Sequence, residues 1–158
     1  MRRSFFIFPV LLLISLMLQL LALPDLVAPA RPLWVAMLFA LWTYISPRSV
    51  SILLAWMIGI AMDVAFNTVL GQHALGLVLV VYLVSRLRKW LIVIPFFQTA
   101  VALIPVWAAY ALVMFWIDGT REQQADPWLR WLPVISTTLM WPFLFPLLNR
   151  LGKPSREE

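Results

Sequence analysis

Three ionisable side chains lie where they could do chemistry inside or beside apolar segments. Asp63 lies within an apolar run of the sequence, and Arg31 and His73 lie near the starts of two other runs. A carboxylate at the centre of a bilayer costs about 2.5–3.5 kcal/mol, so a partner is needed to compensate it. Asp63 is about four residues, or roughly 6 Å along a helix, from the end of its run near Asn67. We therefore expect an ion pair between Arg31 and Asp63, with His73 nearby, that holds three helices together at one membrane face.

Two other interpretations of Asp63 stay open. The carboxylate can reach interfacial water without a protein partner. It can also belong to a proton or cation relay, but a relay needs a chain of titratable groups through the bilayer. Asp63 is the only acidic residue inside the apolar runs, so the sequence supports a relay least.

Small residues near Asp63 predict a close contact between helices. Ala55, Gly59 and Asp63 recur every four residues and so share one helix face, where small side chains let a second backbone approach. Gly71, just before the next apolar run, is predicted to form a turn with positive φ.

The sequence offers little for catalysis or metal binding. It has no Cys and one His, so it provides no disulfide and no cluster of metal ligands. No Ser-His-Asp set and no pair of acids can be assembled within the runs. The net charge is +5, but the basic residues are scattered and form no continuous face for phosphates. We expect no enzyme, cofactor, metal or nucleic-acid partner.

The elements that must position these residues are membrane helices. Of the 158 residues, 63% are hydrophobic and 12% are charged, and mean hydropathy is +0.92, whereas soluble domains are about half apolar and a quarter charged. We therefore predict an all-α integral membrane protein with one membrane domain over 1–158, six transmembrane helices and short loops. The predicted spans cover residues 5–23, 33–45, 50–66, 74–85, 90–117 and 131–148.

Several details of this layout follow from length, proline and charge. The second and fourth spans are short, and the fifth, with Pro95 and Pro105, is predicted as one tilted or kinked helix. Residues 149–158 are predicted to be a disordered cytoplasmic tail. Six crossings place nine of the twelve Lys and Arg residues on the side of both termini, which is therefore cytoplasmic.

Two charged segments each allow an interpretation without a binding role and an interpretation with one. The cluster Arg86, Arg88 and Lys89 is a topology determinant, or it contacts anionic headgroups or a cytoplasmic partner. The loop 118–130 docks an external partner or is simply solvated.

An ordered set of short motifs resembles a known family over essentially the whole chain. Arg31-Pro32-Leu33-Trp34 opens the second run, Gly59-Ile60-Ala61-Met62-Asp63 lies in the third, and Leu70-Gly71 precedes the fourth. With Trp141-Pro142 in the last run, this set resembles the rod shape-determining protein MreD family of Gram-negative bacteria. Leu33 departs from the family pattern, in which Asn or Asp often follows Arg-Pro. The candidate structural and interaction residues are Arg31, Pro32, Gly59, Asp63, Gly71 and His73.

The resemblance implies an inner-membrane subunit of the machinery that elongates the rod-shaped cell and couples lateral peptidoglycan synthesis to MreB filaments. It implies MreC, RodA and a class B penicillin-binding protein as partners, with MreB contacted indirectly. The family is also distantly similar to the six-helix substrate-binding subunits of energy-coupling-factor transporters.

We expect a non-enzymatic scaffold that docks partner helices. The alternative is a small-molecule binding or transport subunit, in which Asp63, Arg31 and His73 contact a polar ligand in an outward-facing pocket. A membrane enzyme acting on lipid-linked substrates has the fewest residues to support it.

Overall fold

The computed structural model describes residues 2–24, 27–46, 50–119 and 128–152, and these residues form helices and connections without a strand. Seven α-helices and two 3₁₀ turns follow one another along the described chain. They are α1 (Arg2–Leu20), η1 (Ala28–Ala30), α2 (Trp34–Ile45), α3 (Ile52–Phe66), α4 (Gln72–Leu91), α5 (Phe96–Ala102), α6 (Ile104–Gly119), η2 (Leu129–Trp131) and α7 (Leu132–Gly152).

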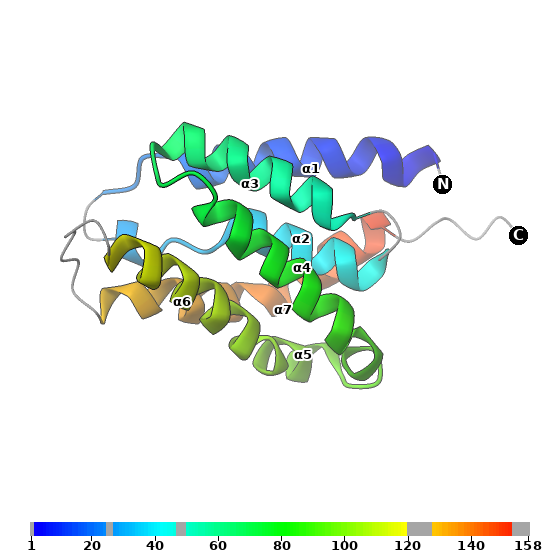
Figure 1. Ribbon diagram of the computed structural model, residues 1–158. Helices are drawn as coiled ribbons and strands as arrows, with labels where there is room; N and C mark the ends of the chain where they lie inside the picture. The colour runs from blue at the N-terminus through cyan, green and yellow to red at the C-terminus, as the bar shows by residue number, and fades with distance from the viewer. Residues whose placement is uncertain (1, 25–26, 47–49, 120–127, 153–158) are drawn as a thin grey trace, which may run out of the picture.

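The helices run back and forth along one common direction, so that α1 begins and α7 ends at the same end of the bundle (Figure 1). This end is named the terminal end below. The opposite end carries the α3–α4 turn, the linker between α1 and α2, and η2, and it is named the turn end. The connections at the turn end position the candidate site.

Helix α2 forms the centre of the bundle and packs against α1, α4 and α7. Every residue from Val35 to Thr43 is buried, and this segment carries no charged residue. With 12 residues, α2 is about 18 Å long, so the helix predicted to be short is short. The ring of Phe8 on α1 packs against those of Phe39 and Trp42, with centroids 5.8 and 5.2 Å apart.

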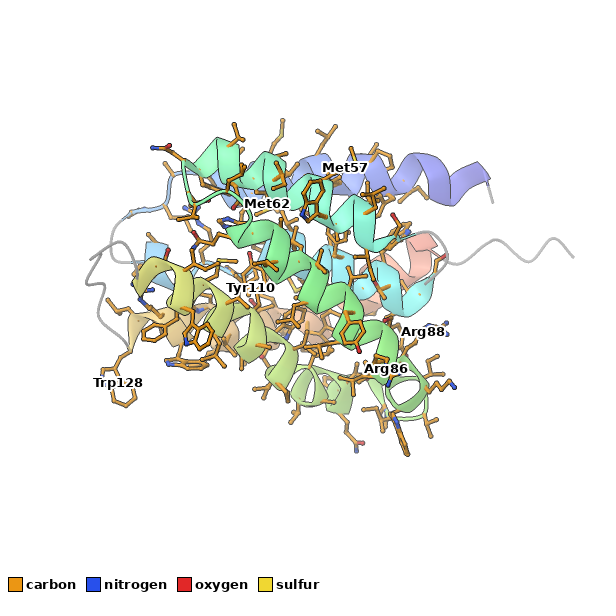
Figure 2. All side chains as sticks on the ribbon, in the orientation of Figure 1. Met57, Met62, Arg86, Arg88, Tyr110 and Trp128 are labelled. Carbon is orange, nitrogen blue, oxygen red and sulfur yellow. The ribbon has the colours of Figure 1, made fainter. Side chains whose placement is uncertain are left out.

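Large apolar side chains also cover the outside of the bundle. Met57 on α3 is 56% exposed, and Figure 2 shows it on the outer side of the helices. Large exposed apolar surfaces are rare on soluble monomers, so this exterior suits hydrocarbon. Within the described residues, the helical stretch Phe97–Gly119 is long and apolar enough by itself to cross a membrane. The shorter apolar helices are Ile7–Leu20 and Ile52–Phe66.

The structure corrects two of the predicted spans. The fourth helix is not short, because α4 covers Gln72–Leu91, 20 residues or about 30 Å. The fifth span begins later than residue 90, because α4 includes Trp90 and Leu91 and a turn precedes Phe96. The helical stretch that follows is interrupted at Leu103, where α5 and α6 meet, as a kinked helix predicts. Pro95 precedes the first residue of α5, and Pro105 has no N–H to continue the helical bonding.

The predicted tail also begins later than expected. Helix α7 continues through Gly152, and residues 153–158 lie outside the described residues. Most of the loop 118–130 also lies outside them, so its two interpretations stay open. That each pass of the chain crosses a bilayer stays a prediction.

Candidate functional site

Asp63 is the most completely bonded polar side chain at the turn end. It is 1% exposed, and its Oδ2 accepts a hydrogen bond from the N–H of Gly71 at 2.8 Å. Its Oδ1 accepts from the N–H of His73 at 2.8 Å and from the hydroxyl of Thr68 at 3.0 Å. The Nδ1 atom of His73 lies 2.8 Å from the same oxygen. A buried carboxylate is costly unless it is bonded in this way.

The carboxylate of Asp63 also completes the start of α4. The first N–H groups of a helix have no partner inside the helix, and the N-cap residue Gly71 has no side chain to supply one. Asp63 bonds two of the amides there and places its negative charge at the positive end of the helix dipole. A side chain of α3 thus fixes where α4 begins.

The backbone of the α3–α4 turn is built from two residues with positive φ. Asn67, the C-cap of α3, has φ 51°, and Gly71 has φ 98°. Asn tolerates the left-handed region better than most residues, and Gly has no Cβ to hinder it. The positive φ predicted at Gly71 is confirmed.

Gly59 lets the backbones of α3 and α4 meet. A Cβ atom at position 59 would lie 2.2 Å from the Cα of Ala74 and 2.5 Å from its nitrogen. Ala55, Gly59 and Asp63 are all buried on α3, so the helix contact predicted for this face is observed.

His73 is held by an aromatic ring and two oxygens. Its ring stacks on that of Phe66 with centroids 5.4 Å apart, and Thr68 Oγ1 lies 3.3 Å from its Nδ1. In a catalytic triad, the acid and the hydroxyl contact opposite ring nitrogens of the histidine. Here both Asp63 and Thr68 contact Nδ1. The cluster therefore has the composition of a triad but not its geometry.

The predicted ion pair between Arg31 and Asp63 is wrong. The Arg31 guanidinium donates to the backbone carbonyl of Gln19 and, at 2.6 Å, to that of Leu21. The last carbonyls of a helix lack partners inside the helix and form the negative end of its dipole, which attracts a cation. Arg31 therefore closes the end of α1, while Asp63 is bonded within its own hairpin.

The residues after Arg31 join three helices. The N–H of Trp34 donates to the side-chain oxygen of Gln19 at 3.1 Å, and the Pro32 carbonyl also lies 2.9 Å from that nitrogen. The N–H of Leu33 donates to Thr137 Oγ1 on α7 at 2.9 Å. The motif that opens the second run is thus a structural joint between α1, α2 and α7.

A second polar network at the turn end was missed by the sequence analysis. The side-chain amide of Gln72 donates to Asp118 Oδ1 at 2.8 Å, and Arg130 contacts Asp118 Oδ2 at 3.1 Å. The Arg130 guanidinium also lies over the Phe115 ring, 5.4 Å from its centre. The network links α4, α6 and η2. Gln72 and Asp118 are 46 residues apart, so only the packing of α4 on α6 brings them together.

A cavity of about 260 Å³ opens beside this second network. Its apolar walls come from α6, the residue before α2 and the start of α7, and Asp118 and Arg130 also line it. The apolar lining residues are Leu33, Tyr110, Ala111, Met114, Phe115 and Pro133. Arg31, Asp63 and His73 do not line this cavity, so it is not the polar pocket expected of these three residues.

The basic cluster of α4 divides into two kinds of residue at the terminal end. Arg88 donates from Nε to the carbonyl of Tyr44 at 2.8 Å, which closes the end of α2. Arg86 and Lys89 are exposed, and Figure 2 shows Arg86 and Arg88 near the end of α4. Arg88 therefore has a structural contact beyond any effect on topology.

The part of the chain that the structure describes contains no group of three or more His, Cys, Asp or Glu residues that could hold a metal ion. The polar groups at the turn end mainly bond to helix ends and to one another. The arrangement therefore orders helices and leaves the Asp63 carboxylate buried.

Comparison with known proteins gives one family and one relative. The family described as rod shape-determining protein MreD matches residues 2–151. The protein named rod shape-determining protein MreD of Haemophilus influenzae is 24% identical over 130 residues, which cover 78% of this chain and 76% of that protein. No solved structure matches the chain.

Proposed function

Because the chain belongs to the MreD family of rod shape-determining proteins, we propose that it is a multi-pass scaffold of the bacterial inner membrane. In this role it holds together the complex that elongates the rod-shaped cell and performs no chemical turnover. The observation that carries the proposal is the use of the buried charge. Asp63 is 1% exposed and is bonded to four groups of its own hairpin, so its carboxylate has a structural role.

The other polar groups support the same reading. A catalytic site needs a nucleophile, a base and an orienting group placed around a space where a substrate can react. Arg31 and Arg88 bond to the carbonyl ends of α1 and α2, and His73 contacts Asp63 and Thr68 through one nitrogen. These contacts order helices, which is the task of a scaffold.

The partners that the family resemblance implies are MreC, RodA and a class B penicillin-binding protein, with MreB contacted indirectly. We propose that their membrane helices pack on the apolar exterior of the bundle. Helix α3 offers such a surface, because Leu53, Met57 and Val64 are more than half exposed along it.

We propose that both termini face the cytoplasm. The start of α1 and the end of α7 share one end of the bundle (Figure 1), and the exposed Arg86 lies near the same end (Figure 2). An excess of Lys and Arg marks the cytoplasmic side of membrane proteins. Fluorescent-protein and alkaline-phosphatase fusions at residue 158 test this, and phosphatase activity there would contradict it.

The distant likeness to substrate-binding subunits of energy-coupling-factor transporters also stays a prediction.

Depletion and complementation in a rod-shaped host test the scaffold role. Loss of the protein should give rounded cells, and the tagged wild-type chain should restore rods and co-purify with MreC and RodA from membranes. Rods that persist after depletion would contradict the proposal.

A His73→Gln variant separates a scaffold from a catalyst or proton relay. It removes the only imidazole of the chain and keeps a polar side chain at the site. At an unchanged protein level, a scaffold should still restore rods and retain its partners. Loss of rods with normal protein level and normal partner binding would instead show that the chemistry of His73 is needed.

A further inference from the structure

The cavity beside Asp118 and Arg130 combines apolar walls, which suit hydrocarbon, with an ion pair, which suits a polar environment. Among the described residues that line it, six are apolar and two, Asp118 and Arg130, form an ion pair at 3.1 Å. At about 30 Å³ for each water-sized group, its volume of about 260 Å³ holds about eight or nine such groups. The apolar walls of the cavity favour a hydrocarbon group over water. The cavity therefore fits a short hydrocarbon segment whose polar end lies at the ion pair.

Tryptophan side chains place this cavity at the depth of the lipid headgroups. Trp116 and Trp128 are 81% and 83% exposed, and Trp131 is also exposed. Trp116 precedes Asp118 on α6, and Trp128 and Trp131 flank Arg130 in sequence; Figure 2 shows Trp128 at the turn end. Exposed Trp residues gather where headgroups meet hydrocarbon. In the proposed membrane placement, the ion pair therefore lies in the headgroup layer.

The charges of the pair favour one class of headgroup. Asp118 and Arg130 present one negative and one positive group side by side, so their net charge is zero. An anionic headgroup gains from Arg130 but is repelled by Asp118, whereas a zwitterionic headgroup places its ammonium near Asp118 and its phosphate near Arg130. A carboxylate accepts about four hydrogen bonds, and Asp118 accepts from Gln72 and Arg130, so its oxygens can accept a further contact without separating from Arg130.

We propose that this cavity binds a phospholipid with a zwitterionic headgroup, whose phosphate contacts Arg130, whose ammonium contacts Asp118, and whose apolar part enters the cavity. The lipid would then join α6 to the start of α7 at the turn end. This site depends on the proposed membrane placement of the chain but not on its role as a scaffold.

Native mass spectrometry of the full chain tests the proposal. The chain is purified in detergent with equal amounts of phosphatidylethanolamine and phosphatidylglycerol that carry the same acyl chains. We expect the ethanolamine lipid to be retained about two- to fivefold more than the glycerol lipid, the range of one partly exposed ion pair. Equal retention, or more phosphatidylglycerol, would overturn the proposal.

Three variants locate the site. Asp118→Asn removes the partner of the ammonium and should bring the ratio of the two lipids close to one. Ala111→Phe fills the cavity and should abolish retention, whereas the same substitution at the exposed Ala61 on α3 should leave it unchanged. A folded Ala111→Phe protein that retains lipid like the wild type would overturn the site. If Ala111→Phe does not fold, an unchanged ratio in Asp118→Asn overturns it instead.

One further measurement distinguishes a bound lipid from a bound headgroup. Glycerophosphoethanolamine has the same charges but no acyl chains. At the same concentration as the lipid it should not displace phosphatidylethanolamine, because the apolar walls of the cavity contribute to binding. Displacement by this soluble compound would overturn the assignment to a lipid.

Discussion

The α3–α4 turn and the α1–α2 linker each use one charged side chain to finish a helix, and the two charges have opposite signs. In the turn, Asp63 accepts the N–H groups of Gly71 and His73 at the start of α4. In the linker, Arg31 donates to the carbonyls of Gln19 and Leu21 at the end of α1. Each sign is the one that the helix dipole favours at that end. Two charges on one side of a bundle therefore do not need each other as partners.

The two regions differ in whether water can bond to the backbone groups when the charged side chain is removed. Asp63 is 1% exposed, and its donors lie within the same hairpin. Arg31 is half-buried, and its contact with Leu21 lies at the exposed edge of the linker. Groups orphaned in the buried turn stay without partners, whereas the carbonyls of the linker can bond to water or to headgroups. We therefore expect equal chemical changes to have unequal effects in the two regions.

The largest effect is expected when the carboxylate of the turn is removed. Asp63→Ala leaves the amides of Gly71 and His73 buried without an acceptor, which costs about 3–5 kcal/mol of the free energy of unfolding. Asp63→Asn keeps the shape and one acceptor oxygen, so its loss should be smaller. The apparent Tm of the purified variants in detergent measures the difference. Asp118→Asn, the same substitution at a carboxylate whose side chain is 28% exposed, is the matched control for Asp63→Asn and should lower the Tm less than Asp63→Asn does. An equal fall in Tm for Asp63→Asn and Asp118→Asn would contradict the effect expected of burial.

A smaller effect is expected where α3 and α4 touch. In Gly59→Ala, the new Cβ meets the Cα of Ala74 at 2.2 Å, so the helices must move apart, at a cost of about 1–3 kcal/mol. Gly119→Ala is the control, because nothing lies within 4 Å of a Cβ there. Ala74→Gly should not rescue Gly59→Ala, because the contact is with backbone atoms. A Tm restored in the double variant would show that the close approach depends on side chains instead.

The local features of the turn could be predicted from the sequence, because their causes lie within one hairpin. Spacing by four residues places Gly59 and Asp63 on one face, and a glycine before an apolar run indicates a turn, as observed at Gly71. The same short separation brings His73 to Asp63.

The remaining contacts depend on which helices are neighbours, which a periodic pattern does not encode. Arg31 reaches Gln19 because α1 ends at Leu20 and the linker folds back over that end, whereas the sequence suggested a longer span. Gln72 meets Asp118 only because α4 packs on α6. Arg31 and Asp63 do not pair for a related reason: the free ends of α1 and α4 are the partners of the two charges, and a sequence does not show which helix ends lie beside a charge.

The smallest effect is expected when the charge of Arg31 is removed from the α1–α2 linker. Arg31→Gln removes the cation at the end of α1 and should cost about 1 kcal/mol, because a charge near a helix end contributes about that much and exposed carbonyls can be solvated. Arg86→Gln removes the same charge from an exposed position of α4 and should change stability by less than about 0.5 kcal/mol. The apparent Tm of both variants in the same detergent measures the two effects. If Arg31→Gln lowered the Tm as much as Asp63→Ala, exposure would not explain the difference between the two regions, and the linker would be a joint as essential as the turn.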